Sequence, residues 1–123
     1  NMVAGWSGMI LGLIAGASIG LFFHDEAFAG GYASFRRRLV RLGHVAFFGL
    51  GILNVLFALT LQVTGVESRY PALASISLIA GAVLMPLVCF LSAWKRPFRH
   101  LFALPVVCVA IPLALLTEGL VKL

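Results

Sequence analysis

The sequence contains few charged residues and very few acids. Nine lysines and arginines and four aspartates and glutamates make up 11% of the 123 residues, whereas about a quarter of the residues of a soluble domain are charged. Hydrophobic residues reach 62%, against roughly half in soluble proteins. The shortage of charge excludes an ordinary soluble domain and predicts an all-α integral membrane protein.

The sequence also lacks the residue patterns of common catalytic and metal sites. Its two cysteines, Cys89 and Cys108, lie in apolar segments and do not have ligand spacing. It contains no HExxH, GxSxG, P-loop or dinucleotide-binding fingerprint. No acid lies in the middle of an apolar segment, which argues against a proton pump or an ion-coupled transporter acting alone. We therefore expect neither an enzyme nor a metal site.

Four apolar segments are each long enough to cross a bilayer. A transmembrane helix needs about 20 apolar residues, and the segments cover approximately residues 2–23, 42–64, 72–94 and 101–120. The first segment lacks the basic flank and cleavage site of a signal peptide, so it is counted as a span. We expect residues 1–123 to form a single domain, a bundle of four antiparallel transmembrane helices.

The basic residues are distributed unevenly between the connections. Seven of the nine lie in the first and third connections, at Arg36, Arg37, Arg38, Arg41, Lys95, Arg96 and Arg99; the others are Arg69 and Lys122. The positive-inside rule therefore places these two connections in the cytoplasm and both termini on the non-cytoplasmic side.

This topology explains the net charge of +5 without nucleic-acid binding. The expected location is the bacterial inner membrane. There the seven basic side chains would contact anionic lipid headgroups, with the acidic groups of a protein partner as an alternative for the first connection.

Glycine recurs at every fourth position of the first span, at Gly8, Gly12, Gly16 and Gly20. Residues four apart lie nearly on one helix face, with a drift of about 40° per step. Because little hydrophobic force pairs helices in lipid, a face without side chains favours close van der Waals packing. The stripe predicts a packing face for a helix of the same chain or of another subunit. A flat cofactor ring, such as haem or a chlorin, is a further alternative.

Two polar residues of the second span are candidates for a functional role. Asn54 lies near its middle and is expected to form a hydrogen bond with another helix. His44 lies near its cytoplasmic end and is followed two turns later by Gly51, which would leave room for a porphyrin. One interpretation of His44 is an axial haem ligand, although the second histidine would have to be His24 or His100 at headgroup level. The other interpretation is a structural hydrogen bond.

Three functional classes remain. Small size, short connections and the glycine stripe favour a non-catalytic accessory subunit of a larger membrane complex, expected in respiratory or photosynthetic electron transfer. It would dock through its glycine face and its apolar, aromatic surface. The alternative is a small haem b redox carrier that uses His44. A transporter or channel-forming oligomer is less favoured, because the polar residues that could line a path leave its cytoplasmic half without a polar lining. These residues are Asn54, Gln62, Ser75, Ser77 and Thr117.

Overall fold

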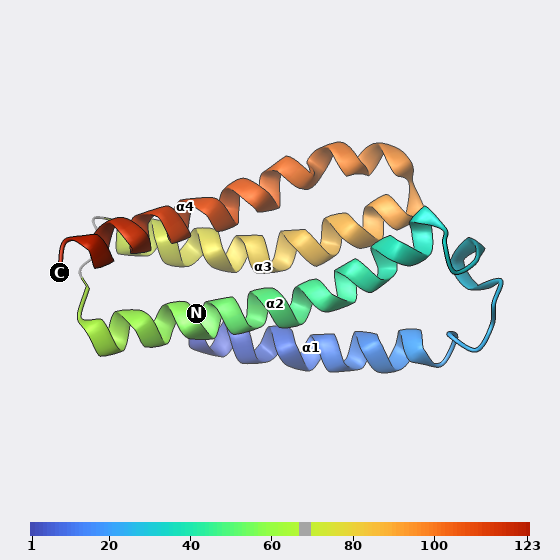
Figure 1. Cartoon of the computed structure of the whole chain (residues 1–123), viewed down its shortest axis with the longest axis horizontal. Helices are drawn as coiled ribbons and strands as arrows, with labels where there is room; N and C mark the ends of the chain where they lie inside the picture. Colours follow the sequence, from blue (N-terminus) through green and yellow to red (C-terminus); the bar gives the residue numbers. More distant parts are fainter. Residues whose placement is uncertain (67–69) are drawn as a thin grey trace.

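A computed structural model describes residues 1–66 and 70–123, which contain four long helices (Figure 1). They are α1 (Met2–Gly20), α2 (Phe35–Thr64), α3 (Pro71–Trp94) and α4 (Ala103–Val121), with short 3-10 segments η1 (Phe28–Gly30) and η2 (Arg96–Phe102). Four helical segments are long and apolar enough to cross a membrane. This confirms the expected all-helical chain with four candidate spans. Arg69, which entered the orientation argument, lies outside the described residues.

Local sequence signals account for the ends of α2 and for the start of α3. The Ser34 hydroxyl caps α2 by accepting a hydrogen bond of 3.1 Å from the Arg37 backbone N–H. The helix ends at Gly65, whose φ of 65° is left-handed and therefore suits glycine. Pro71 occupies the first turn of α3, where a missing N–H costs nothing. α2 thus begins well before the apolar segment and includes the arginine-rich stretch that precedes it.

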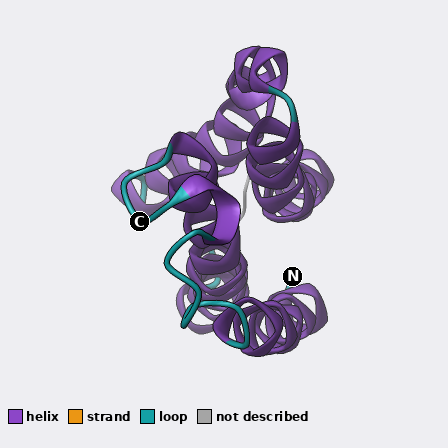
Figure 2. Ribbon diagram, turned by 90° about the vertical axis from the view of Figure 1, so that its right-hand side faces the viewer, coloured by secondary structure: helices purple, strands orange, loops and turns teal. Residues whose placement is uncertain are grey.

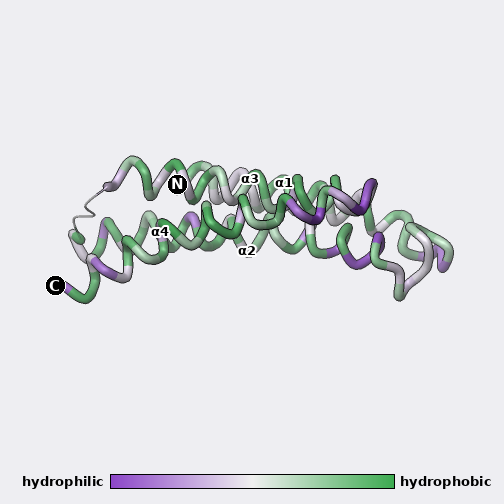
Figure 3. The backbone as a smooth tube through the Cα atoms, turned by 90° about the horizontal axis from the view of Figure 1, so that it is seen from above, coloured by the Kyte–Doolittle hydropathy of each residue, from purple (hydrophilic) through white to green (hydrophobic). Residues whose placement is uncertain are grey.

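The helices form a staggered row in chain order. Extensive contacts join α1 to α2, α2 to α3 and α3 to α4, whereas α1 and α3 meet only slightly. Viewed along their axes, the helices do not close into a square (Figure 2). Viewed from above, α1 and α3 lie on one side of the row, and α2 and α4 lie on the other (Figure 3). The two inner helices therefore have two close neighbours each, and the two outer helices have one.

The buried apolar side chains gather between the inner helices. Phe57 of α2 and Ala74 and Leu78 of α3 form this cluster, and five partly buried residues pack against it: Leu53, Leu61, Val109, Leu115 and Leu116. Large apolar side chains on the outward faces remain exposed, among them Ile14 and Val83. Such surfaces are unfavourable in water and suit a hydrocarbon environment.

The first and third connections lie at the same end of the row, opposite the C-terminus (Figure 1). The seven basic residues of these connections therefore lie at this end, which we call the basic end.

Candidate functional site

α1 and α2 approach each other most closely where two glycines meet. A Cβ atom added to Gly5 would lie 2.5 Å from the Gly51 carbonyl oxygen, and one added to Gly51 would lie 2.8 Å from the Gly5 carbonyl oxygen. Both residues are buried. The two backbones are in direct contact here, so neither position accepts a side chain unless the helices separate.

Side chains of α2 fill the space beside two glycines of the predicted stripe. A Cβ added to Gly12 would lie 2.8 Å from Phe48 Cε2. One added to Gly16 would overlap His44 Cε1 and lie 3.0 Å from His44 Nδ1. The neighbour that covers this part of α1 is therefore a helix of the same chain.

The other two glycines of the stripe are in looser surroundings. A Cβ added to Gly8 would lie 3.6 Å from the nearest neighbouring atom, the Phe47 carbonyl oxygen, and one added to Gly20 would meet nothing within 4 Å. Gly5, which the four-residue spacing misses, makes the tightest contact with the backbone of α2. A strict four-residue repeat winds about 40° per step around the helix, so the face toward α2 follows Gly5, Gly12 and Gly16 instead.

His44 lies in the α1–α2 interface, where its ring meets the Phe48 ring edge to face at a centroid distance of 5.5 Å. Its Nδ1 atom is buried and has no hydrogen-bond partner in the described part of the chain. The imidazole itself occupies the space above Gly16. A macrocycle placed between His44 and α1 would therefore have to displace α1.

The space beside Gly51 is also filled. The Gly5 carbonyl oxygen and Met9 Cγ each lie 2.8 Å from the position of an added Cβ. His24 and His100 are exposed; His24 lies in the first connection, between α1 and η1, and His100 lies in η2. Across residues 1–66 and 70–123, no three histidine, cysteine, aspartate or glutamate side chains gather as a metal site would require.

Asn54 is fully buried and joins three parts of the chain. Its Nδ2 donates to the Leu50 carbonyl at 2.9 Å on its own helix and to the Leu78 carbonyl at 3.5 Å on α3. Its Oδ1 accepts a bond of 2.8 Å from Asn1 Nδ2. Asn1 in turn accepts a bond of 2.6 Å from the Ser75 hydroxyl. The contacts within this network are between protein groups, so it needs no ligand to explain it.

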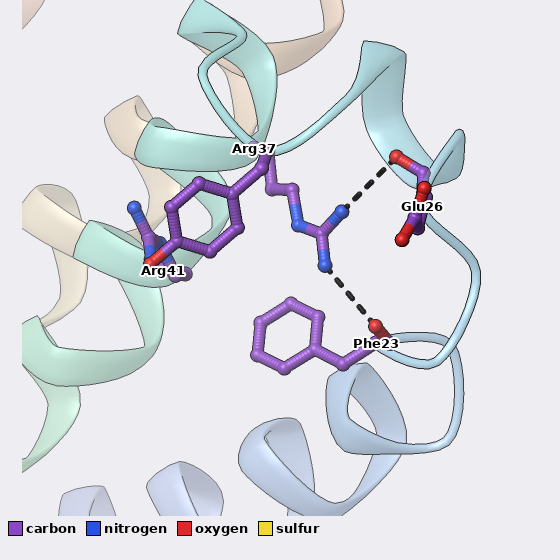
Figure 4. Close-up of a pocket in the computed structure, with 5 residues that line it drawn as sticks. Phe23, Glu26, Arg37 and Arg41 are labelled. Carbon is purple, nitrogen blue, oxygen red and sulfur yellow. Dashed lines mark hydrogen bonds between the residues drawn. The ribbon is translucent and has the colours of Figure 1, made fainter.

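Arg37 differs from the other basic residues because it is only 5% exposed. Its Nη1 donates to the carbonyls of Asp25 and Glu26 at 3.4 Å each, and its Nη2 donates to the Phe23 carbonyl at 3.2 Å (Figure 4). Its guanidinium carbon also lies 5.0 Å from the centre of the Phe23 ring. The side chain therefore fastens the first connection to the start of α2.

From the sequence, Arg37 is expected among the residues that contact lipid headgroups, whereas in the structure its guanidinium is buried against the backbone of the first connection. The run Arg36–Arg37–Arg38 does not itself indicate which arginine turns inward. The aromatic residues of the connection could have indicated that an arginine packs against it, because Phe28 and Tyr32 also lie within cation–π distance of Arg37, at 5.9 and 5.5 Å.

A pocket of about 650 Å³ opens at the basic end, lined by Phe23, Glu26, Tyr32, Arg37 and Arg41 (Figure 4). The half-buried Arg41 places its guanidinium carbon 5.0 Å from the centre of the Tyr32 ring. The other five basic residues are exposed at the same end: Arg36, Arg38, Lys95, Arg96 and Arg99. The basic end thus combines an exposed basic surface with this pocket and a smaller one beside Arg36 and Arg96.

Together, the four long apolar helices and the outward apolar faces define the class as an α-helical membrane protein. No family model, curated protein or solved structure is similar to this chain.

Proposed function

We propose that this chain is a small, non-catalytic accessory subunit that docks against other subunits of a larger membrane complex. The observation that carries the proposal is a groove between α1 and α3. Its volume is about 460 Å³, and it is lined by Ala4, Ser7, Gly8, Leu11, Phe47, Ile79, Ala82, Val83, Leu87 and Phe90. Four of these residues are small, and small residues allow a further helix to approach closely in lipid.

The row arrangement supports this docking mode. In a closed square α1 would also pack against α4, whereas here the extensive contacts between the described helices join only successive ones, and the groove between α1 and α3 stays open. Gly8, which is loosely packed against α2, contributes to the groove wall. The proposed occupant is an apolar helix of another membrane subunit, and a complex of respiratory or photosynthetic electron transfer is the proposed setting.

We further propose that the four helices cross a bacterial inner membrane in antiparallel order, with the basic end in the cytoplasm and both termini on the opposite side. The gathering of seven basic residues at one end supports this orientation. The exposed basic side chains would contact anionic lipid headgroups at that surface.

Photo-crosslinking in native membranes tests the docking proposal. A benzoylphenylalanine at Leu11, which lines the groove and is 52% exposed, is compared with one at Ile14, which is 58% exposed on the same helix but does not line the groove. The expected result is a discrete crosslinked polypeptide from Leu11 and none from Ile14. A chain that migrates alone after mild solubilisation, with no crosslink from either position, would contradict the proposal.

The haem b alternative rests on the unpaired Nδ1 of His44. It is less well supported, because the contacts of His44 with Gly16 and of Gly51 with Gly5 leave no gap for the ring. Absorption spectra of the oxidised and reduced protein, expressed with sufficient haem, decide between the two functions. A Soret band that disappears in His44→Ala would replace the subunit proposal with the redox carrier.

A further inference from the structure

We infer that the pocket at the basic end binds one phosphate-bearing anion through Arg37 and Arg41. The pocket lies between the first connection and the start of α2, and it has a volume of about 650 Å³. This inference deepens the headgroup contact proposed above, because it assigns that contact to a defined site rather than to a diffuse basic surface.

Arg37 has no ion-pair partner among the described residues. Its side chain is 5% exposed, yet no carboxylate of residues 1–66 or 70–123 forms an ion pair with Arg37 or Arg41. Carbonyl oxygens and aromatic rings surround the Arg37 guanidinium instead. A buried charge without an opposite charge is costly. A bound anion would supply the missing charge.

Arg37 also carries a hydrogen-bond donor that is unpaired among the described residues. The Nε atom of Arg37 is buried and has no partner in the described part of the chain, although its two Nη atoms donate to carbonyls. An unpaired buried donor is unfavourable. Because Arg37 lines the pocket, an anion that enters can provide an acceptor oxygen.

The guanidinium groups of Arg37 and Arg41 lie against the same aromatic ring. They lie one helical turn apart on α2, and the Tyr32 ring contacts both, at 5.5 Å from Arg37 and 5.0 Å from Arg41. The ring thus restrains two cations at one wall of the pocket. Paired planar guanidinium groups match the several acceptor oxygens of a phosphate better than a single carboxylate does.

Glu26 sets the balance of charge in the pocket. Its carboxylate is exposed, lines the pocket and forms no ion pair there. Two positive groups and one negative group therefore face an entering anion, and removal of the Glu26 charge should tighten binding. Glu26 thereby provides a variant whose effect is opposite to that of the arginine variants.

The phosphate has two sources, an acidic phospholipid headgroup or a soluble phosphate. Leu21 and Phe22, which follow α1 directly, are exposed apolar residues beside this end of the molecule. They would contact acyl chains if the phosphate belonged to a lipid.

Native mass spectrometry of the purified chain in phosphatidylcholine-containing micelles tests the site, with phosphatidylglycerol or inorganic phosphate as the added probe. We expect Arg41→Gln to weaken saturable phosphatidylglycerol binding by about tenfold or more, since it removes a charged hydrogen-bonding partner. Glu26→Gln should tighten binding a few-fold. The matched control is Arg38→Gln, which removes an equal charge from an exposed neighbour whose guanidinium already bonds the Ala33 carbonyl. It should leave the affinity within about twofold.

If the three variants change the affinity for phosphatidylglycerol in this way, the result supports the site and identifies a lipid as its ligand. The same order of affinities for inorganic phosphate, without a preference for phosphatidylglycerol, supports the site with a soluble ligand and contradicts the headgroup contact. Equal losses in Arg41→Gln and Arg38→Gln, or no saturable binding of either probe, overturn the inference. Circular dichroism checks the fold of each variant; if Arg41→Gln loses helix, failure of Glu26→Gln to tighten binding overturns the inference.

Discussion

α2 packs against its two neighbours in different ways. Toward α1 it presents Gly51, whose backbone touches that of Gly5, so the two backbones are in direct contact at this point. Toward α3 it presents Phe57, which is buried against Ala74 and Leu78, and the polar Asn54. Even the glycine on this side, Gly43, faces side-chain atoms, with Phe90 Cζ 3.0 Å from an added Cβ.

This difference between the two interfaces shows what each of them tolerates. Side chains can rotate and make room, whereas two backbones in contact cannot move without shifting whole helices. We therefore expect the α1–α2 interface to be sensitive to added volume and the α2–α3 interface to be sensitive to lost volume or lost hydrogen bonds.

The largest effect is expected from Gly51→Ala. Its methyl group would lie 2.8 Å from the Gly5 carbonyl oxygen, and we expect a loss of about 3 kcal/mol, the upper end of the usual range for overpacking. The measurement is the free energy of unfolding in mixed micelles titrated with SDS. Gly49→Ala is the control, because nothing lies within 4 Å of an added Cβ on that residue of the same helix. A stability of Gly51→Ala equal to that of Gly49→Ala would show that the backbones are not in contact.

A smaller effect is expected from Gly16→Ala, because the obstacle is the His44 side chain rather than backbone. We expect a loss of about 2 kcal/mol in unfolding free energy. Combining it with His44→Ala should restore much of this loss, because the added methyl group would then occupy the vacated space. A double-mutant cycle by SDS titration measures the coupling. Strictly additive effects would argue against contact between Gly16 and His44.

Asn54→Leu tests the polar contact with α3. It removes the donor to the Leu78 carbonyl and the acceptor of the Asn1 amide. Interhelical hydrogen bonds in membranes contribute about 0.6–2 kcal/mol, so we expect a loss of about 1 kcal/mol in thermal or SDS unfolding. Thr60→Val is the control, since its hydroxyl donates to Leu56 on its own helix. Equal losses of stability from the two substitutions would show that the contact of Asn54 with α3 does not stabilise the protein.

The smallest effect is expected at the α3–α4 interface. Ser77 donates a bond of 2.8 Å to the Cys108 carbonyl, and Ser77→Ala should cost about 0.6 kcal/mol, the average for such bonds. Thr117→Val is the control, because its hydroxyl bonds Leu113 within α4. The free energy of unfolding, measured under the same conditions, would compare the contribution of this interface with those of the other two. A loss larger than that of Asn54→Leu would reverse the expected order.

The residues of the candidate site differ in how far the sequence could identify them. Asn54, Gly12, Gly16 and Gly51 are distinctive on their own, because a polar residue or a glycine in an apolar helix needs a reason. Gly5 lies outside the four-residue repeat and makes the tightest contact with the backbone of α2. The rotation of α1 against α2 selects it, and that rotation depends on the packing of two helices rather than on spacing within one.

Hydrophobicity and charge act locally along the chain, so the amino-acid order is enough to predict the helical class, the four apolar segments and the concentration of basic residues in two connections. The tertiary structure decided that the helices form an open row, that α2 covers the glycine face, and that Arg37 turns inward while Arg36 and Arg38 remain exposed. These features depend on distances between residues far apart in the chain. Helix rotation and the path of the first connection set those distances, and no local pattern encodes them.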